Sequence, residues 1–92
     1  MRCCDAAIEV LRETNNPAVM AGDLGLLHMI ADRLDWKHEG PRTTDRVIAA
    51  LHKTPGELLR KYTLGSRNQR TSLFILPERA SEYFKEGNSQ NV

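Results

Sequence analysis

The chain has 92 residues, of which 40% are hydrophobic and 27% are charged, which is ordinary for one small globular domain. The formal net charge of +1 says nothing about a polyanionic partner, and no apolar run approaches the length that crosses a bilayer. The N-terminus lacks the basic-then-apolar pattern of a secretory signal, so we expect a cytoplasmic location, or a nuclear one in a eukaryote.

The first part of the chain predicts two helices separated by a breaker. A first helix is expected over about residues 4–13, because its apolar side chains recur at helical spacing. These are Cys4, Ala7, Ile8 and Leu11. The Asn-Asn-Pro sequence at 15–17 ends this helix, and residues 18–20 are either a minimal strand or a simple connector. Asp23 is expected to cap a second helix, whose apolar face consists of Leu24, Leu27, Ala31 and Leu34.

A third helix is expected over about residues 43–53, capped by Thr43 or Thr44 and stopped by a Pro-Gly pair. Its apolar stripe consists of Thr44, Val47, Ile48 and Leu51. The opposite face carries Arg46, Ala49 and Lys53, with Arg42 just before the helix. Asp45, near the N-terminal end of this helix, has three alternative roles: repulsion of phosphate, acceptance of a hydrogen bond from a cytosine amino group, or interaction with the helix dipole. We expect the dipole role.

Two strands are expected over about residues 58–64 and 71–76, joined by a turn-rich basic loop. Alternation along the first strand places Arg60, Tyr62 and Leu64 on one side, and Leu59, Lys61 and Thr63 on the other. Pro77 opens a short last helix, in which Ala80 can pack back. A folded domain over residues 1–86 and a disordered tail over 87–92 are predicted.

Tyr83 and Phe84 are neighbours in that last helix, so both rings cannot point into one core. We expect one ring to pack on the first helix and the other to be partly exposed. An exposed ring there offers a contact for a homodimer, or for a different protein.

These elements predict a mainly α fold with a small β-hairpin (α+β), namely a three-helix bundle, a wing and a short C-terminal helix. This order resembles the winged helix-turn-helix superfamily over about residues 4–76. Within it, the chain is similar to the HARE-HTH type at Leu34-Asp35-Trp36, Gly40, Thr44, Val47, Ala50-Leu51, Phe74 and Leu76. Such modules are associated with DNA transactions and chromatin. The connector over residues 35–41 is longer than the 3–4-residue turn of a compact helix-turn-helix.

Charge is concentrated in one part of the chain. Residues 1–41 carry a net charge of −3, residues 42–70 a net charge of +5, and residues 71–92 a net charge of −1. A basic block confined to one helix and one hairpin is the electrostatic pattern of a nucleic-acid binding surface.

The function expected is double-stranded DNA binding, as a transcriptional regulator or DNA-targeting module, with the third helix in the major groove and the wing (about residues 58–76) on the backbone. Arg46 suits a guanine contact and Lys53 a phosphate contact. Arg67 and Arg70 suit phosphates or the minor groove. The candidate DNA-binding residues are Arg42, Thr43, Arg46, Ala49, Lys53, Arg60, Lys61, Arg67, Asn68 and Arg70. The alternative reading of each basic cluster is a solvated helix face or a solubilising hairpin tip.

Other functional classes have less support in the sequence. No glycine-rich phosphate loop or nucleophile–base motif is present, so we expect no enzyme activity and no cofactor. The adjacent Cys3 and Cys4, with dispersed histidines, predict no metal site. A winged helix that binds a protein through Trp36, Tyr83 and Phe84 is the main rival. Binding of RNA or a single strand is disfavoured, because only Tyr62 is an aromatic near the basic region.

Overall fold

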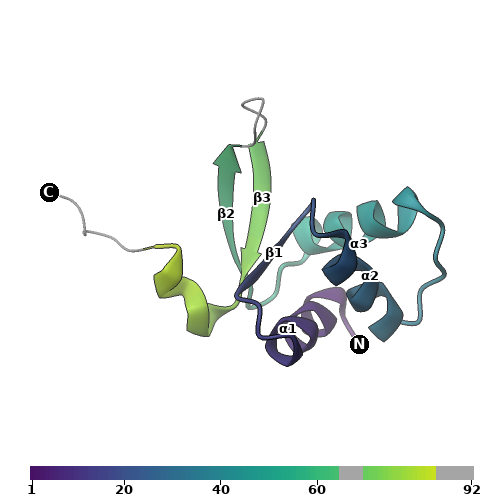
Figure 1. The fold of residues 1–92 in the computed structure, drawn as a ribbon, viewed down its shortest axis with the longest axis horizontal. Coiled ribbons are helices and arrows are strands. Elements are labelled where there is room, and N and C mark those ends of the chain that lie inside the picture. Colours follow the sequence, from purple (N-terminus) through teal and green to yellow (C-terminus); the bar gives the residue numbers. More distant parts are fainter. Residues whose placement is uncertain (65–69, 85–92) are drawn as a thin grey trace, which may run out of the picture.

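The computed structural model describes residues 1–64 and 70–84, which form three α-helices, a three-stranded antiparallel sheet and a 3₁₀ helix (Figure 1). In chain order the elements are α1 (Cys3–Glu13), β1 (Ala18–Met20), α2 (Leu24–Arg33), α3 (Pro41–Lys53), β2 (Leu59–Leu64), β3 (Arg70–Ile75) and the 3₁₀ helix η1 (Pro77–Glu82). The predicted α+β class and the order of the elements are confirmed. Figure 1 shows the β2–β3 hairpin projecting away from the helices.

The sheet has the strand order β1-β3-β2, so the short segment at 18–20 is a strand and not merely a connector. It pairs antiparallel with β3, placing Val19 opposite Phe74. Both of these side chains are fully buried on the face of the sheet that packs against the helices. The other face of the sheet carries Leu73 and Ile75.

The core lies between the three helices and the inner face of the sheet. The predicted stripe of α1 is confirmed, since Cys4, Ala7, Ile8 and Leu11 are all buried. In α2 the buried stripe begins one turn later than predicted, at Leu27, because Leu24 is the first helical residue and its side chain is 55% exposed. Phe74 from β3 and Leu51 from α3 complete the centre of this core.

The ends of α1 and α2 share one backbone motif. Asn15 and Asp35 follow their helices with φ of 57° and 60°, in the left-handed region that short polar side chains tolerate better than most. After α2, the Asp35 N–H donates to the carbonyl of Asp32 and the Trp36 N–H to the carbonyl of Ala31, each at 3.0 Å. This is a Schellman motif, and it fixes the backbone of Trp36 directly after the helix.

The start of α3 differs from the expected 43–53. The helix begins two residues earlier, at Pro41, because proline suits the first helical position and Gly40 supplies the turn before it at φ 64°. Thr43 and Thr44 are therefore buried in the first turn and cap nothing; the Thr43 hydroxyl accepts a hydrogen bond from the Glu39 N–H.

Two further expectations about α3 change with this start. Arg42 lies inside the first turn of the helix, not before it. Asp45 lies beyond the first turn, where the helix dipole acts only weakly, so the predicted dipole role is wrong.

The chain after β3 forms η1, which begins at Pro77 as predicted. Tyr83 packs against the outer face of the sheet, beside Leu73 and Ile75, and not on α1 as expected. Phe84 is 41% exposed, so the expectation of one packed and one exposed ring is confirmed. The predicted tail at 87–92 lies outside the described residues. Within the described ranges, no helix has both the length and the apolar content to cross a membrane.

Candidate nucleic-acid interface

One side of α3 is exposed and basic. The side chains of Arg42, Arg46, Ala49 and Lys53 all face solvent, while Val47 and Leu51 are buried, so the two predicted faces are confirmed. Thr43 is the exception among the candidate residues on this helix. Its side chain is only 2% exposed, because it belongs to the buried first turn, so it is not available to a duplex.

The hairpin adds two arginines around an aromatic ring. Arg60 and Arg70 lie on the same side of the sheet as Phe74, which is the side that faces the helices. Their guanidinium carbons are 5.9 and 4.3 Å from the centroid of the Tyr62 ring, within the range of cation–π attraction. Tyr62 is 50% exposed, so its ring is not part of the hydrophobic core.

His52 joins the helix to the hairpin. Its Nδ1 accepts a hydrogen bond of 2.9 Å from the Arg60 guanidinium, and its ring meets Phe74 edge-on at 5.3 Å. The sequence analysis gave His52 no role, although the residue lies on the exposed stripe three positions after Ala49. The contact makes α3 and β2 one continuous surface. We call this surface the basic face; its described residues are Arg42, Arg46, Ala49, His52, Lys53, Arg60, Tyr62 and Arg70.

Two groups of candidates are not part of the basic face. Lys61 points to the opposite side of the sheet, where its ammonium donates a 2.7 Å hydrogen bond to the carbonyl of Tyr83 and lies 5.4 Å from the Phe84 ring. Lys61 therefore does not accompany Arg60 toward α3. Arg67 and Asn68 lie outside the described residues, so their expected roles stay predictions.

Ion pairing divides the described arginines into two groups. Four of them pair with carboxylates: Arg2 with Asp5, Arg12 with Glu78, Arg33 with Glu9 and Glu13, and Arg79 with Glu82. The other four are Arg42, Arg46, Arg60 and Arg70, and all of them lie on the basic face. Among residues 1–64 and 70–84, none of these four forms an ion pair with a carboxylate, and neither does Lys53. None of these five cations is therefore held in an ion pair by a carboxylate of the described chain, although Asp45 is exposed on the same helix.

Arg46 has a particular neighbour in the connector before α3. Its guanidinium carbon lies over the Trp36 ring, 3.9 Å from the centroid, which is a close cation–π contact. Trp36 itself is half-buried and packs against the core. The sequence analysis named Trp36 only as part of a surface that binds a partner protein, and it did not predict the contact with Arg46.

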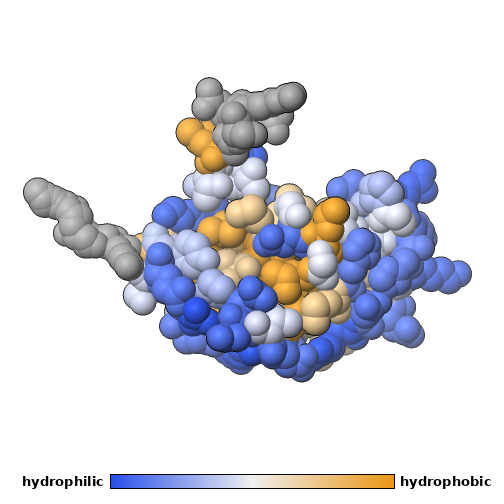
Figure 2. Space-filling view, in the orientation of Figure 1, coloured by the Kyte–Doolittle hydropathy of each residue, from blue (hydrophilic) through white to orange (hydrophobic). Residues whose placement is uncertain are grey.

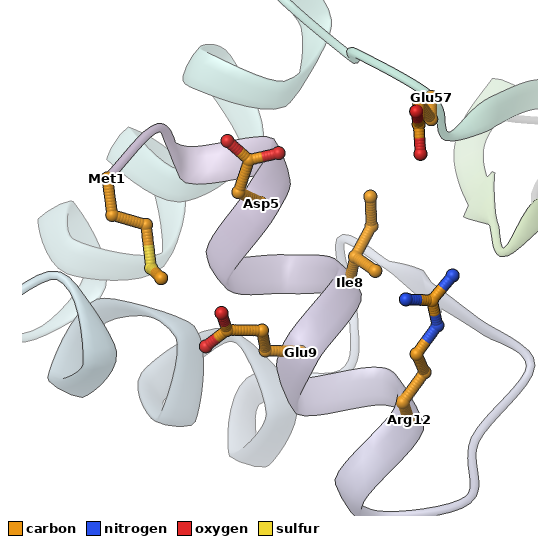
Figure 3. A pocket seen from close by; sticks show the side chains of 6 residues that line it. All are labelled: Met1, Asp5, Ile8, Glu9, Arg12 and Glu57. Carbon is orange, nitrogen blue, oxygen red and sulfur yellow. The ribbon is translucent and has the colours of Figure 1, made fainter.

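A pocket on the other side of α1 has the opposite charge. It measures about 420 Å³ and is lined by Met1, Asp5, Ile8, Glu9, Arg12 and Glu57 (Figure 3). Figure 3 shows Asp5, Ile8, Glu9 and Arg12 projecting from successive turns of α1, with Glu57 reaching in from the loop before β2. Asp5, Glu9 and Arg12 are held in ion pairs. The lining carries three carboxylates and one guanidinium, but Asp5 and Glu9 are each paired with an arginine, so this surface is only weakly acidic.

The outer face of the sheet is apolar. Ala18, Leu73 and Ile75 form a small cluster there, covered in part by Met20 and Tyr83. Figure 2, in which the edge strand β1 is nearest the reader, shows hydrophobic surface in the middle of the molecule, bordered by hydrophilic surface. This face also carries the exposed ring of Phe84, near Lys61.

The cysteines and histidines build no reactive centre in the described part of the chain. Cys3 and Cys4 are both free thiols, and Cys4 is buried. Burial and the neighbouring Cys4 raise the pKa of the Cys3 thiol to about 11, which keeps it protonated at neutral pH. His28 and His38 stack on each other at 5.2 Å, and His38 pairs with Asp32. No group of three or more metal-ligating side chains occurs among the residues described.

Comparisons of the chain with protein-family models, with curated proteins and with solved structures each give no match. The function is therefore inferred from the basic face itself. That face combines a helix with an exposed basic stripe and a projecting hairpin, linked through His52 and Arg60.

Proposed function

We propose that this chain is a winged helix that binds double-stranded DNA, with α3 in the major groove and the β2–β3 hairpin against the flanking backbone. The proposal is supported by the order of the elements, in which a helix, strand, helix and helix precede a projecting hairpin. It is also supported by the dimensions of α3, whose thirteen residues extend about 20 Å, and by the ability of the major groove to admit one helix. The biological role that fits is transcriptional regulation or the targeting of a larger assembly to DNA.

The observation that carries the proposal is the segregation of the arginines. Exposed ion pairs stabilise a fold by at most about 1 kcal/mol, so leaving an exposed arginine without a carboxylate costs the folded chain little. Such arginines are available to phosphates and bases, with which a guanidinium forms bidentate hydrogen bonds. The four described arginines of this kind lie on α3 and on the β2–β3 hairpin, whereas the four paired arginines lie on α1, α2 and η1 or directly before α1.

A titration with three nucleic acids tests the proposal. Fluorescence anisotropy is measured with a labelled duplex of mixed sequence, the same sequence as a single strand, and the RNA duplex. We expect the DNA duplex to bind with a Kd of about 1–100 μM at physiological salt and more tightly than the single strand. Equal or tighter binding of the single strand or the RNA, or no binding of any of them at low salt, would contradict the proposal.

The second candidate function is a protein-interaction module, and the outer face of the sheet favours it. Leu59 is 40% exposed and Phe84 is 41% exposed on that face, next to the cluster of Leu73 and Ile75. Exposed aromatic side chains such as that of Phe84 are enriched in the buried cores of protein interfaces. The homodimer expected through Tyr83 and Phe84 would use the same face, and sedimentation of the free protein separates the dimer from a monomer.

A further inference from the structure

We infer that Trp36 is a positioning residue for DNA reading: its ring holds the Arg46 guanidinium so that the fork of N–H groups faces a guanine in the major groove. The inference rests on the proposed function and extends it to a specific base and a specific supporting residue.

The first step of the argument is that Trp36 is fixed from two sides. Its backbone N–H donates to the carbonyl of Ala31, as part of the motif that ends α2. Its ring is half-buried and packs against the hydrophobic core. A side chain held by both its backbone and its packing provides a platform whose position does not depend on the ligand.

The second step is that the platform restrains Arg46 without using its hydrogen-bond donors. A guanidinium over an aromatic ring is attracted through its flat face, while its five N–H groups point outward in its plane. The guanidinium carbon lies 3.9 Å from the centroid of the Trp36 ring. No acceptor within residues 1–64 and 70–84 takes a hydrogen bond from the Arg46 guanidinium, so the fork is restrained and unoccupied.

The third step is the place of Arg46 on the basic face. It lies in the middle of α3, whereas Arg42 lies in the first turn and Lys53 is the last helical residue. One turn after Arg46 comes Ala49, whose methyl group leaves the approach of a base pair open. A recognition helix contacts base edges mainly through residues toward its N-terminus, and Arg46 lies in the first half of α3.

The chemistry of the fork identifies the base. Guanine presents two acceptors, O6 and N7, side by side in the major groove, and an arginine fork matches them with two hydrogen bonds. Adenine presents one acceptor and one donor there, so the second N–H of the fork would face a donor. A restrained guanidinium forms these bonds with less loss of side-chain freedom than a mobile one.

The test begins with the wild-type chain. A preferred duplex is selected from a random pool, and its Kd is compared with those of its single base-pair variants, which identifies the position where guanine is required. Failure to enrich or bind any duplex removes the proposed function, before any variant is made. Binding of duplex with no guanine requirement at any position overturns the inference and leaves the proposed function standing.

The decisive variants are W36L and R46A, made singly and together. W36L keeps an apolar side chain for the core and removes the ring face, so we expect the preference for guanine to fall about two- to thirty-fold, the range of a cation–π contact. Affinity for a duplex of unrelated sequence should stay unchanged, because no charge is lost. In the R46A background, W36L should have no further effect on base preference, as expected for residues that act as a pair.

W36F and R46K are the conservative variants. W36F restores an aromatic face and should recover most of the preference lost in W36L, whereas R46K keeps the charge but loses the fork and should match R46A at the guanine position. If the W36L variant does not unfold cooperatively, the inference is tested instead by comparing the preference for guanine of W36F with that of R46K. The inference is overturned if W36L or R46K keeps the wild-type preference for guanine, or if the effects of W36L and R46A on that preference are additive. It is also overturned if the W36L variant loses affinity equally for every duplex.

Discussion

The salt dependence of duplex binding follows directly from the charges of the basic face. Five described cations lie there without a carboxylate partner, namely Arg42, Arg46, Lys53, Arg60 and Arg70. If Arg46 contacts a base, four cations remain for phosphates, and log affinity should fall against log salt with a slope of about −3.6. Between 50 and 200 mM salt this slope corresponds to a loss of affinity of about 150-fold. A further phosphate contact by Arg67 would steepen the slope to about −4.5.

Arg42→Gln should remove one of these contacts and reduce the slope by about 0.9, so that the same change of salt weakens binding only about 40-fold. The matched control is Arg12→Gln. It removes an exposed arginine that lies on α1, away from the basic face, and that is paired with Glu78. The control should keep the wild-type slope. The measurement is anisotropy at several salt concentrations. A wild-type slope near zero, or an equal reduction in both variants, would refute the assignment of phosphate contacts to the basic face.

Three further outcomes are expected. Gly56→Ala should destabilise the fold by about 3 kcal/mol in urea denaturation, because φ is +60° there and the new Cβ would lie 2.6 Å from the buried Cys4 sulfur; wild-type stability would contradict this. Alkylation of Cys3 in the folded protein should be slow at neutral pH and rise toward pH 11, since burial and Cys4 raise its pKa to about 11, whereas a rate that levels off near pH 9 would disprove the shift. Phe84→Ala should leave duplex affinity within about twofold, because the ring lies near Lys61 on the far side of the sheet from α3; a larger loss would mean that a dimer through this face supports DNA binding.

The faces of α3 were predictable because they depend only on local geometry. Residues three and four apart share one side of a helix, so Val47 and Leu51 had to lie opposite Arg46 and Lys53 once the segment was helical. The same reasoning placed Arg60 and Lys61 on opposite sides of β2. Local periodicity therefore predicted most of the basic face.

The start of α3 was not predictable in the same way, because two signals compete there. A threonine cap and a proline at the first helical position both mark a helix start, and they differ by two residues in this chain. Tertiary packing decides between them, since burial of Thr43 and Thr44 requires their turn to be helical already. One candidate DNA contact, Thr43, was lost for this reason.

The contacts that join separate elements were also missed. Trp36 meets Arg46 only because the motif after α2 directs the connector back toward α3. His52 meets Arg60 only because the turn at residues 54–58 returns β2 to the end of α3. Spacing along the chain predicts neither contact, because the path of each loop depends on the packing of the elements that it joins.

The most direct measurement of the central claim is an NMR titration of the labelled protein with a DNA duplex. We expect the amide shifts to change along α3 from Arg42 to Lys53 and along the hairpin at Arg60, Tyr62 and Arg70. Residues lining the acidic pocket on α1 and residues on the outer face of the sheet should keep their shifts. Changes concentrated around Leu73, Tyr83 and Phe84, or around Asp5 and Glu57, would contradict binding through the basic face.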